Sequence, residues 1–117
     1  MHRVTIDRSA AVPVVVAGGE LDAYAEPDLR SAFAELAGDT RLVVDLNRVS
    51  FLDSTALGAV VRSLRELDER GGEGLVVLPR GPARRIFELT TLDRALPVAG
   101  SRVQALASLT ARQLAGD

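Results

Sequence analysis

The residues with the clearest chemical potential in this chain are three neighbours, Asp53, Ser54 and Thr55. They stand where an apolar, strand-like segment ends and a helical pattern begins, so a hydroxyl of Ser54 or Thr55 is expected to cap the helix by accepting a backbone N–H. A helix N-terminus also has unpaired N–H groups and the positive end of the helix dipole, which stabilise an anion by roughly 0.3 to 1 kcal/mol. Two interpretations follow: a helix cap alone, or a hydroxyl that can be phosphorylated without harm to the fold.

The composition excludes most other kinds of reactive site. The 117 residues include no Cys and one His, and all 14 basic residues are Arg. Disulfides, zinc–thiolate sites and cysteine nucleophiles are therefore excluded, and without Lys there is no complete Walker-type phosphate loop and no Schiff-base chemistry. A catalytic Ser/His/Asp triad and a His-ligated metal are not expected, because His2 lies beside the first residue, where a fixed geometry is rare. The net charge of -2 gives no indication of nucleic-acid binding.

The elements that must position Ser54 follow from the hydrophobic pattern. Strands are expected around 4–6, 12–17, 41–46 and 75–78, with a short one near 98. Helices are expected after Pro27, over 57–67, after Pro82 and after Ser101. Gly18-Gly19 is expected to end the second strand, and a polar turn is expected over 47–50. The alternation predicts an α/β fold, with a mixed sheet of about five strands covered by about four helices, in a single domain over residues 1–117.

The hydropathy pattern predicts neither a membrane-spanning segment nor a signal peptide. No apolar run approaches the roughly 20 residues of a membrane span, and the first eight residues contain no signal-peptide hydrophobic segment. A cytoplasmic protein that does not bind membranes is therefore expected.

Four segments together resemble a known family. The chain is similar to the STAS-domain anti-sigma factor antagonists of bacteria through Gly19-Glu20-Leu21-Asp22, Leu42-Val43-Val44-Asp45-Leu46, Val49-Ser50-Phe51-Leu52-Asp53-Ser54-Thr55-Ala56-Leu57-Gly58 and Leu89-Thr90-Thr91-Leu92-Asp93. The first segment alone is a weak signal and the Asp-Ser-Thr motif a moderate one. Their spacing, with a strand before the second motif, makes the resemblance strong and extends it over nearly the whole chain.

The resemblance implies a phosphorylation switch. In this family the unphosphorylated protein binds an anti-sigma factor that is also an ATP-dependent serine kinase, and a sigma factor is thereby freed. The kinase phosphorylates the first hydroxyl after the motif Asp, here Ser54, and a metal-dependent serine phosphatase reverses the reaction. Mapped by motif, Asp53 and Asp22 would lie beside Ser54 on the partner-binding surface, and Thr55 is the less favoured acceptor. Independently of the resemblance, Thr55 and the loop aromatic Tyr24 are further candidate contacts on this surface. The resemblance implies a kinase substrate that is not itself an enzyme and has no cofactor.

Two positions depart from the family pattern. Ala56 stands where the family usually has Gly, and Ala is the better helix former, so little harm to the fold is expected. Thr91 stands where many members have Gly near the end of the third helix. If that position needs a positive φ, the helix end is built differently here.

Other interpretations stay open. The same domain could be an accessory or scaffold subunit of a transport or stress-sensing complex, without a Ser switch. Asp45 faintly resembles the strand-end nucleophile of haloacid-dehalogenase-type phosphatases, although Asn47 replaces the second acid and the required Lys is absent. Otherwise Asp45 is structural and accepts hydrogen bonds from the turn near 49–50. Asp22 is either a loop cap or a partner contact, and Tyr24 either an interface anchor or a packed side chain. A monomer or weak dimer is expected.

Overall fold

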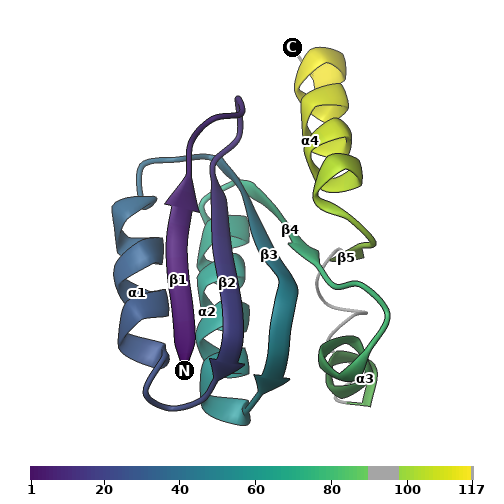
Figure 1. Ribbon diagram of the computed structural model, residues 1–117. Coiled ribbons are helices and arrows are strands. Elements are labelled where there is room, and N and C mark those ends of the chain that lie inside the picture. Colours follow the sequence, from purple (N-terminus) through teal and green to yellow (C-terminus); the bar gives the residue numbers. More distant parts are fainter. Residues whose placement is uncertain (90–97, 117) are drawn as a thin grey trace.

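The computed structural model describes residues 1–89 and 98–116, and within them five strands alternate with four helices (Figure 1). The strands are β1 (His2–Asp7), β2 (Val14–Leu21), β3 (Arg41–Leu52), β4 (Glu73–Val77) and β5 (Val98–Ala99). The helices are α1 (Glu26–Glu35), α2 (Ser54–Glu69), α3 (Pro82–Leu89) and α4 (Arg102–Gly116). The predicted element order and α/β class are confirmed. Thr91, one of the two departures from the family pattern, lies outside the described residues.

The strands form one mixed sheet in the order β1-β2-β3-β4-β5. β1 is antiparallel to β2, and each of the other neighbouring pairs is parallel. In a parallel sheet the carboxyl ends of the strands lie at one edge, and residues of consecutive loops meet there. The loops after β2 and β3 therefore come together, and they carry the candidate site.

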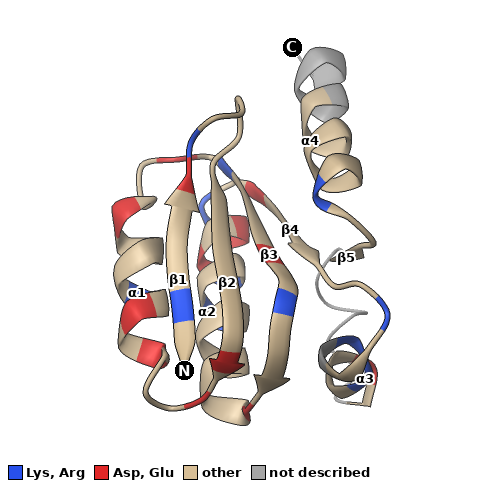
Figure 2. Cartoon of the chain, viewed as in Figure 1, with Lys and Arg blue, Asp and Glu red and all other residues tan. Residues whose placement is uncertain are grey.

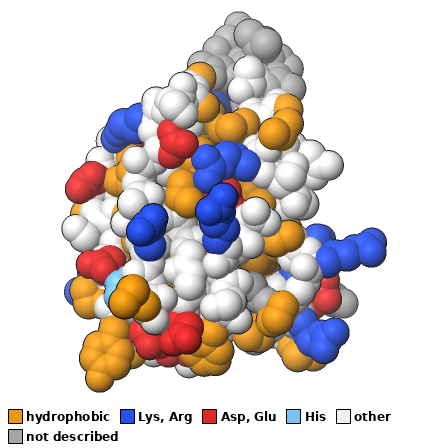
Figure 3. All heavy atoms as spheres, in the orientation of Figure 1, with side chains coloured by type: hydrophobic (Ala, Val, Ile, Leu, Met, Phe, Trp, Pro, Cys, Tyr) orange, Lys and Arg blue, Asp and Glu red, His pale blue; other side chains and the backbone are white. Residues whose placement is uncertain are grey.

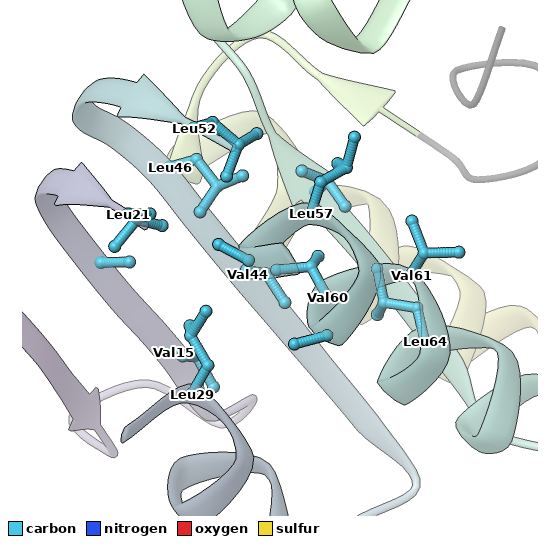
Figure 4. Packing of buried hydrophobic residues seen from close by; sticks show 14 of the residues in the cluster. Val15, Leu21, Leu29, Val44, Leu46, Leu52, Leu57, Val60, Val61 and Leu64 are labelled. Atoms are coloured by element: carbon cyan, nitrogen blue, oxygen red, sulfur yellow. The ribbon is translucent and has the colours of Figure 1, made fainter. Parts of the chain in front are cut away.

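Helices cover the two faces of the sheet unequally. α1 and α2 pack side by side on one face, where the apolar stripe predicted for α2 is buried against the strands (Figures 1 and 4). Its members are Leu57, Val60, Val61, Leu64 and Leu67. On the other face α4 buries Ala105 and Leu109 against Val43, Leu75 and Val77, which leaves the C-terminal part of β3 uncovered. The large cluster between the sheet, α1 and α2 holds the first turn of α2 in place, because Ala56 is fully buried there.

Two predicted boundaries are wrong, and both errors concern the same part of the sheet. β2 continues through Gly18 and Gly19 to Leu21, and β3 continues through residues 47–50. The polar residues that suggested a turn, Asn47, Arg48 and Ser50, are exposed on the uncovered face, whereas Val49 is buried. A strand with one solvated face tolerates this pattern. Gly19 stays in the strand with a φ of +78°, and a Cβ there would clash with the backbone oxygen of Met1.

One buried carboxylate ties α4 to the sheet. Asp45 is 5% exposed, and its oxygens accept hydrogen bonds from the Asn47 N–H at 2.8 Å and from Nε of Arg102 at 2.8 Å. The prediction that Asp45 accepts hydrogen bonds from a turn near residues 49–50 is therefore wrong, because those residues belong to β3 and the donors are Asn47 and Arg102. Arg102 also bonds Asp7 of β1 at 3.1 Å through Nη1. One guanidinium thus links β1, β3 and α4.

Asp7 is held in its charged form. The hydroxyl and N–H of Ser9, and then Arg102, lower the pKa of the Asp7 carboxyl below its usual value. Folding therefore favours the ionised form, and the resulting stabilisation is present above the unfolded pKa and lost as pH falls through the folded one.

Candidate phosphorylation and partner-binding site

The site lies where β2 and β3 end beside each other. Leu21 and Leu52 are register partners, and the N–H of Asp53 donates to the carbonyl oxygen of Leu21 at 3.0 Å. Asp22 and Asp53 are the next residues of the two strands, so the sheet brings together two acids that are 31 positions apart in sequence. The sequence motifs that contain them are therefore parts of one surface.

Asp53, rather than Ser54 or Thr55, caps α2. Its backbone is extended, with φ of -91° and ψ of 173°, and its Oδ1 accepts the N–H of Ala56 at 2.9 Å. The predicted hydroxyl cap is therefore wrong: Ser54 is already the first residue of the helix, and the cap is the residue before it. The consequence is chemical, because the hydroxyl of Ser54 is exposed and makes no hydrogen bond within the described residues. Thr55 is exposed as well.

The surroundings of Ser54 combine opposite electrostatic influences. The N–H groups of the first helical turn lack intrahelical partners, and only that of Ala56 is satisfied by Asp53. The backbone therefore favours an anion on Ser54, whereas the carboxylates of Asp22 and Asp53 oppose one. Figure 2 shows acidic residues along this edge, at the ends of β2 and β3 and in the loop after β2. An added phosphate is supported by the helix and makes an acidic edge still more negative.

Asp22 and Tyr24 shape the loop beside the site. Oδ1 of Asp22 accepts the N–H of Tyr24 at 2.9 Å, so Asp22 does cap the loop, while its second oxygen stays available to a partner. α1 itself begins without a side-chain cap. Tyr24 is 84% exposed, which excludes the alternative that it packs within the domain. An exposed aromatic ring beside a carboxylate is typical of an interface anchor.

Phe51 is a candidate contact residue that sequence reasoning did not single out. Its side chain is 50% exposed, and it is the register partner of Glu20 at the same edge. A register shift between Gly19 and Glu20 accompanies this pairing. Within an apolar motif Phe51 resembles a core residue, and no local sequence signal marks it as exposed. Acidic and hydrophobic side chains accordingly lie together along the lower edge in Figure 3.

Three further features concern catalysis, metal binding and membrane-spanning helices. Both oxygens of Asp45 are hydrogen-bonded and the side chain is buried, so it is not placed as a nucleophile. Across residues 1–89 and 98–116, no cluster of three or more His, Cys, Asp or Glu could hold a metal ion. Nor does any helix in these ranges have the length and apolarity that a membrane span requires.

The two roles of Asp53 can be separated by substitution. Asp53→Asn keeps an oxygen that accepts the Ala56 N–H, so we expect the free energy of unfolding to change by less than about 0.5 kcal/mol, whereas Asp53→Ala should cost about 1 kcal/mol. Urea unfolding of both variants measures the difference. Equal losses would show that the carboxylate charge, and not the cap, stabilises this helix.

Comparison with known proteins places the chain in a family. Residues 3–105 match the STAS domain. The chain is 38% identical over 80 residues to the anti-sigma-B factor antagonist of Staphylococcus aureus (strain NCTC 8325 / PS 47). The aligned region spans 67% of this chain and 74% of that protein. The crystal structure of an anti-sigma factor antagonist from Mycobacterium paratuberculosis superposes with a TM-score of 0.83 at 29% identity, over 92% of this chain and 93% of that one.

More distant structures share the fold. The anti-sigma factor antagonist SpoIIAA in its unphosphorylated form superposes with a TM-score of 0.71 at 20% identity, over 92% of this chain and 97% of that one. The Bacillus cell fate determinant SpoIIAA in its phosphorylated form superposes with a TM-score of 0.70 at 22% identity, over 92% of this chain and 99% of that one. Together with the match over residues 3–105, the sequence and fold show that the chain belongs to the STAS domain family of anti-sigma factor antagonists.

Proposed function

We propose that this protein is an anti-sigma factor antagonist whose binding to an anti-sigma factor with serine kinase activity is switched off by phosphorylation of Ser54. The observation that carries the proposal is the free hydroxyl of Ser54, exposed at the first position of α2 because Asp53 has taken the cap. The names of the curated relatives support the class of partner. A metal-dependent serine phosphatase would reverse the modification.

The switch follows from local electrostatics. A phosphate adds about -1.5 to -2 charges beside Asp22 and Asp53. In the free protein the N-terminus of α2 and water support that charge, so the domain stays folded. In a complex the same dianion must lose water while it faces carboxylates, which disfavours binding unless the partner supplies cations. No large conformational change is needed, and the protein needs no cofactor of its own.

In the unphosphorylated protein, the partner would bind the surface at the ends of β2 and β3. Asp53 and Thr55 are the sequence neighbours of Ser54, and Asp22 follows Leu21, the register partner of Leu52. Tyr24 and Phe51 are exposed at the same end of these two strands. Aromatic side chains contribute much of the binding energy of interfaces, and the acids select a partner with basic groups. We expect the protein to act in the cytoplasm as a monomer or weak dimer, without binding nucleic acid or membranes.

Phosphorylation by the cognate kinase tests the proposal. After incubation with the kinase and ATP, mass spectrometry should place one phosphate on Ser54, and Ser54→Ala should abolish it. Thr55→Ala is the matched control, because it removes the neighbouring exposed hydroxyl of the same helical turn, and it should be modified normally. Modification of Ser54→Ala at full yield would overturn the assignment. Capture of a transporter subunit, without kinase binding, would instead support the accessory-domain function.

A further inference from the structure

The flank of β3 opposite the acidic residues carries a cluster of arginines. β4 ends at Val77, the register partner of Asp45, whereas β3 continues to Leu52. α3 packs against β3, whose C-terminal part pairs with β2 but has no strand partner on the β4 side among the described residues, and Phe87 is fully buried in the same core cluster as Leu52. Asp22, Ser54 and the start of α3 therefore follow three consecutive strands of the sheet: β2, β3 and β4.

The cluster consists of Arg80, Arg84 and Arg85. With Gly81 and Glu88 they line a hollow of about 400 Å³. Arg84 is held in place, because Nη1 bonds the carbonyl oxygen of Leu78 at 3.1 Å and Nε lies 3.4 Å from the carboxylate of Glu88. Arg80 and Arg85 are exposed and have no carboxylate partner among the described residues. The hollow is therefore lined by one arginine held in place, Arg84, and by two arginines whose charges are not compensated by a carboxylate in the described part of the chain, Arg80 and Arg85.

The edge of the sheet where β2 and β3 end thus has negative charge on one side and positive charge on the other. Figure 2 shows the acidic residues at the ends of β2 and β3 and the basic residues of α3 on opposite sides of the end of β3. This contrasts with α2, where Arg62 and Arg65 are interleaved with Glu66 and Glu69 and form no single-sign patch. Patches of opposite sign on one surface steer an approaching partner and fix its orientation.

We propose that Arg80, Arg84 and Arg85 form a second docking surface for the same anti-sigma partner, and that this surface accepts an acidic patch of that protein. The inference rests on the proposed function, since it adds a second contact region for the same anti-sigma partner, separate from the surface around Ser54. Carboxylates suit the hollow, because Arg guanidinium groups bind them with strong, directional hydrogen bonds. The partner would then carry basic groups opposite Asp22 and Asp53 and acidic groups opposite α3.

Charge reversal tests the surface in the full-length chain. In Arg80→Glu/Arg85→Glu we expect the association rate with the anti-sigma partner at low salt to fall about ten-fold, and its dependence on salt concentration to weaken or reverse. The matched control is Arg62→Glu/Arg65→Glu, which makes the same charge change at exposed α2 positions about 12 and 16 Å along the helix from Ser54. The control should retain the association rate within about two-fold. Circular dichroism checks that both variants are folded.

The outcomes separate this inference from the proposed function. If the wild-type chain binds and is phosphorylated on Ser54, and both double variants associate at equal rates, the docking surface is refuted while the switch stands. If the wild-type chain neither binds the kinase nor is phosphorylated, both proposals fall. Duplex DNA binding that only Arg80→Glu/Arg85→Glu abolishes, with unchanged partner association, would assign the arginines to nucleic acid and also overturn the inference.

Discussion

Phosphorylated protein should bind its anti-sigma partner more than a hundred-fold more weakly than the unphosphorylated protein, and Ser54→Glu should bind about ten-fold more weakly. A penalty of roughly 3 kcal/mol corresponds to a factor above a hundred. We expect this penalty because, in the proposed complex, the phosphate dianion would face Asp22 and Asp53 in a desolvated interface. A single carboxylate carries about half the charge, so its effect is smaller. Calorimetric or surface-based titration of the three forms measures the ratios.

Loss of binding in Ser54→Glu must be distinguished from loss of structure. Glu at the first turn interacts favourably with the helix dipole, so the free energy of unfolding should stay equal or rise by up to about 0.5 kcal/mol. Thr110→Glu is a suitable control, because Thr110 is an exposed hydroxyl residue on α4, which covers the other face of the sheet. It should bind like the wild type. Equal affinities of phosphorylated and unphosphorylated protein would refute the switch.

The sequence predicts the position of the candidate site more fully than it predicts the geometry of that site. The sequence alone predicts where the candidate hydroxyl of Ser54 lies, because a strand end followed by a strongly amphipathic helix is a local pattern. The identity of the cap was missed because Asp, Ser and Thr are all good N-caps, and only the backbone dihedral angles decide which of them lies at the boundary. That choice determines whether the hydroxyl of Ser54 is free.

Features that depend on pairing between distant segments were not visible in the sequence. The continuation of β2 and β3 past Gly18 and Asn47 depends on their mutual register, including its shifts, and the exposure of Phe51 follows from the same register. The ion pair between Asp45 and Arg102 joins residues 57 positions apart. Hydrophobic periodicity carries no information about which polar side chains meet across such a separation.

That ion pair makes Arg102 a polar side chain whose loss should strongly destabilise the fold. Arg102→Ala leaves Asp45 buried, with the Asn47 N–H as its remaining partner in the part of the chain that the structure describes, and it removes the link to Asp7. Breaking a fully buried pair costs about 3 to 5 kcal/mol. The Arg102 side chain is 34% exposed, so water screens part of the interaction, and we expect a loss of about 2 kcal/mol in the free energy of unfolding. Urea denaturation measures it.

A double substitution identifies the cause of that loss. Asp45→Asn keeps an oxygen for the Asn47 N–H but removes the buried charge, so adding it to Arg102→Ala should recover more than half of the lost stability. Arg62→Ala, which truncates an exposed arginine of α2, should change stability by less than about 0.5 kcal/mol. If the double variant is no more stable than Arg102→Ala, packing of the arginine stem, and not compensation of the Asp45 charge, holds α4 on the sheet. Because this contact lies on the face that α4 covers, folded Arg102→Ala should still be phosphorylated on Ser54, which separates the stability of the scaffold from the chemistry at its edge.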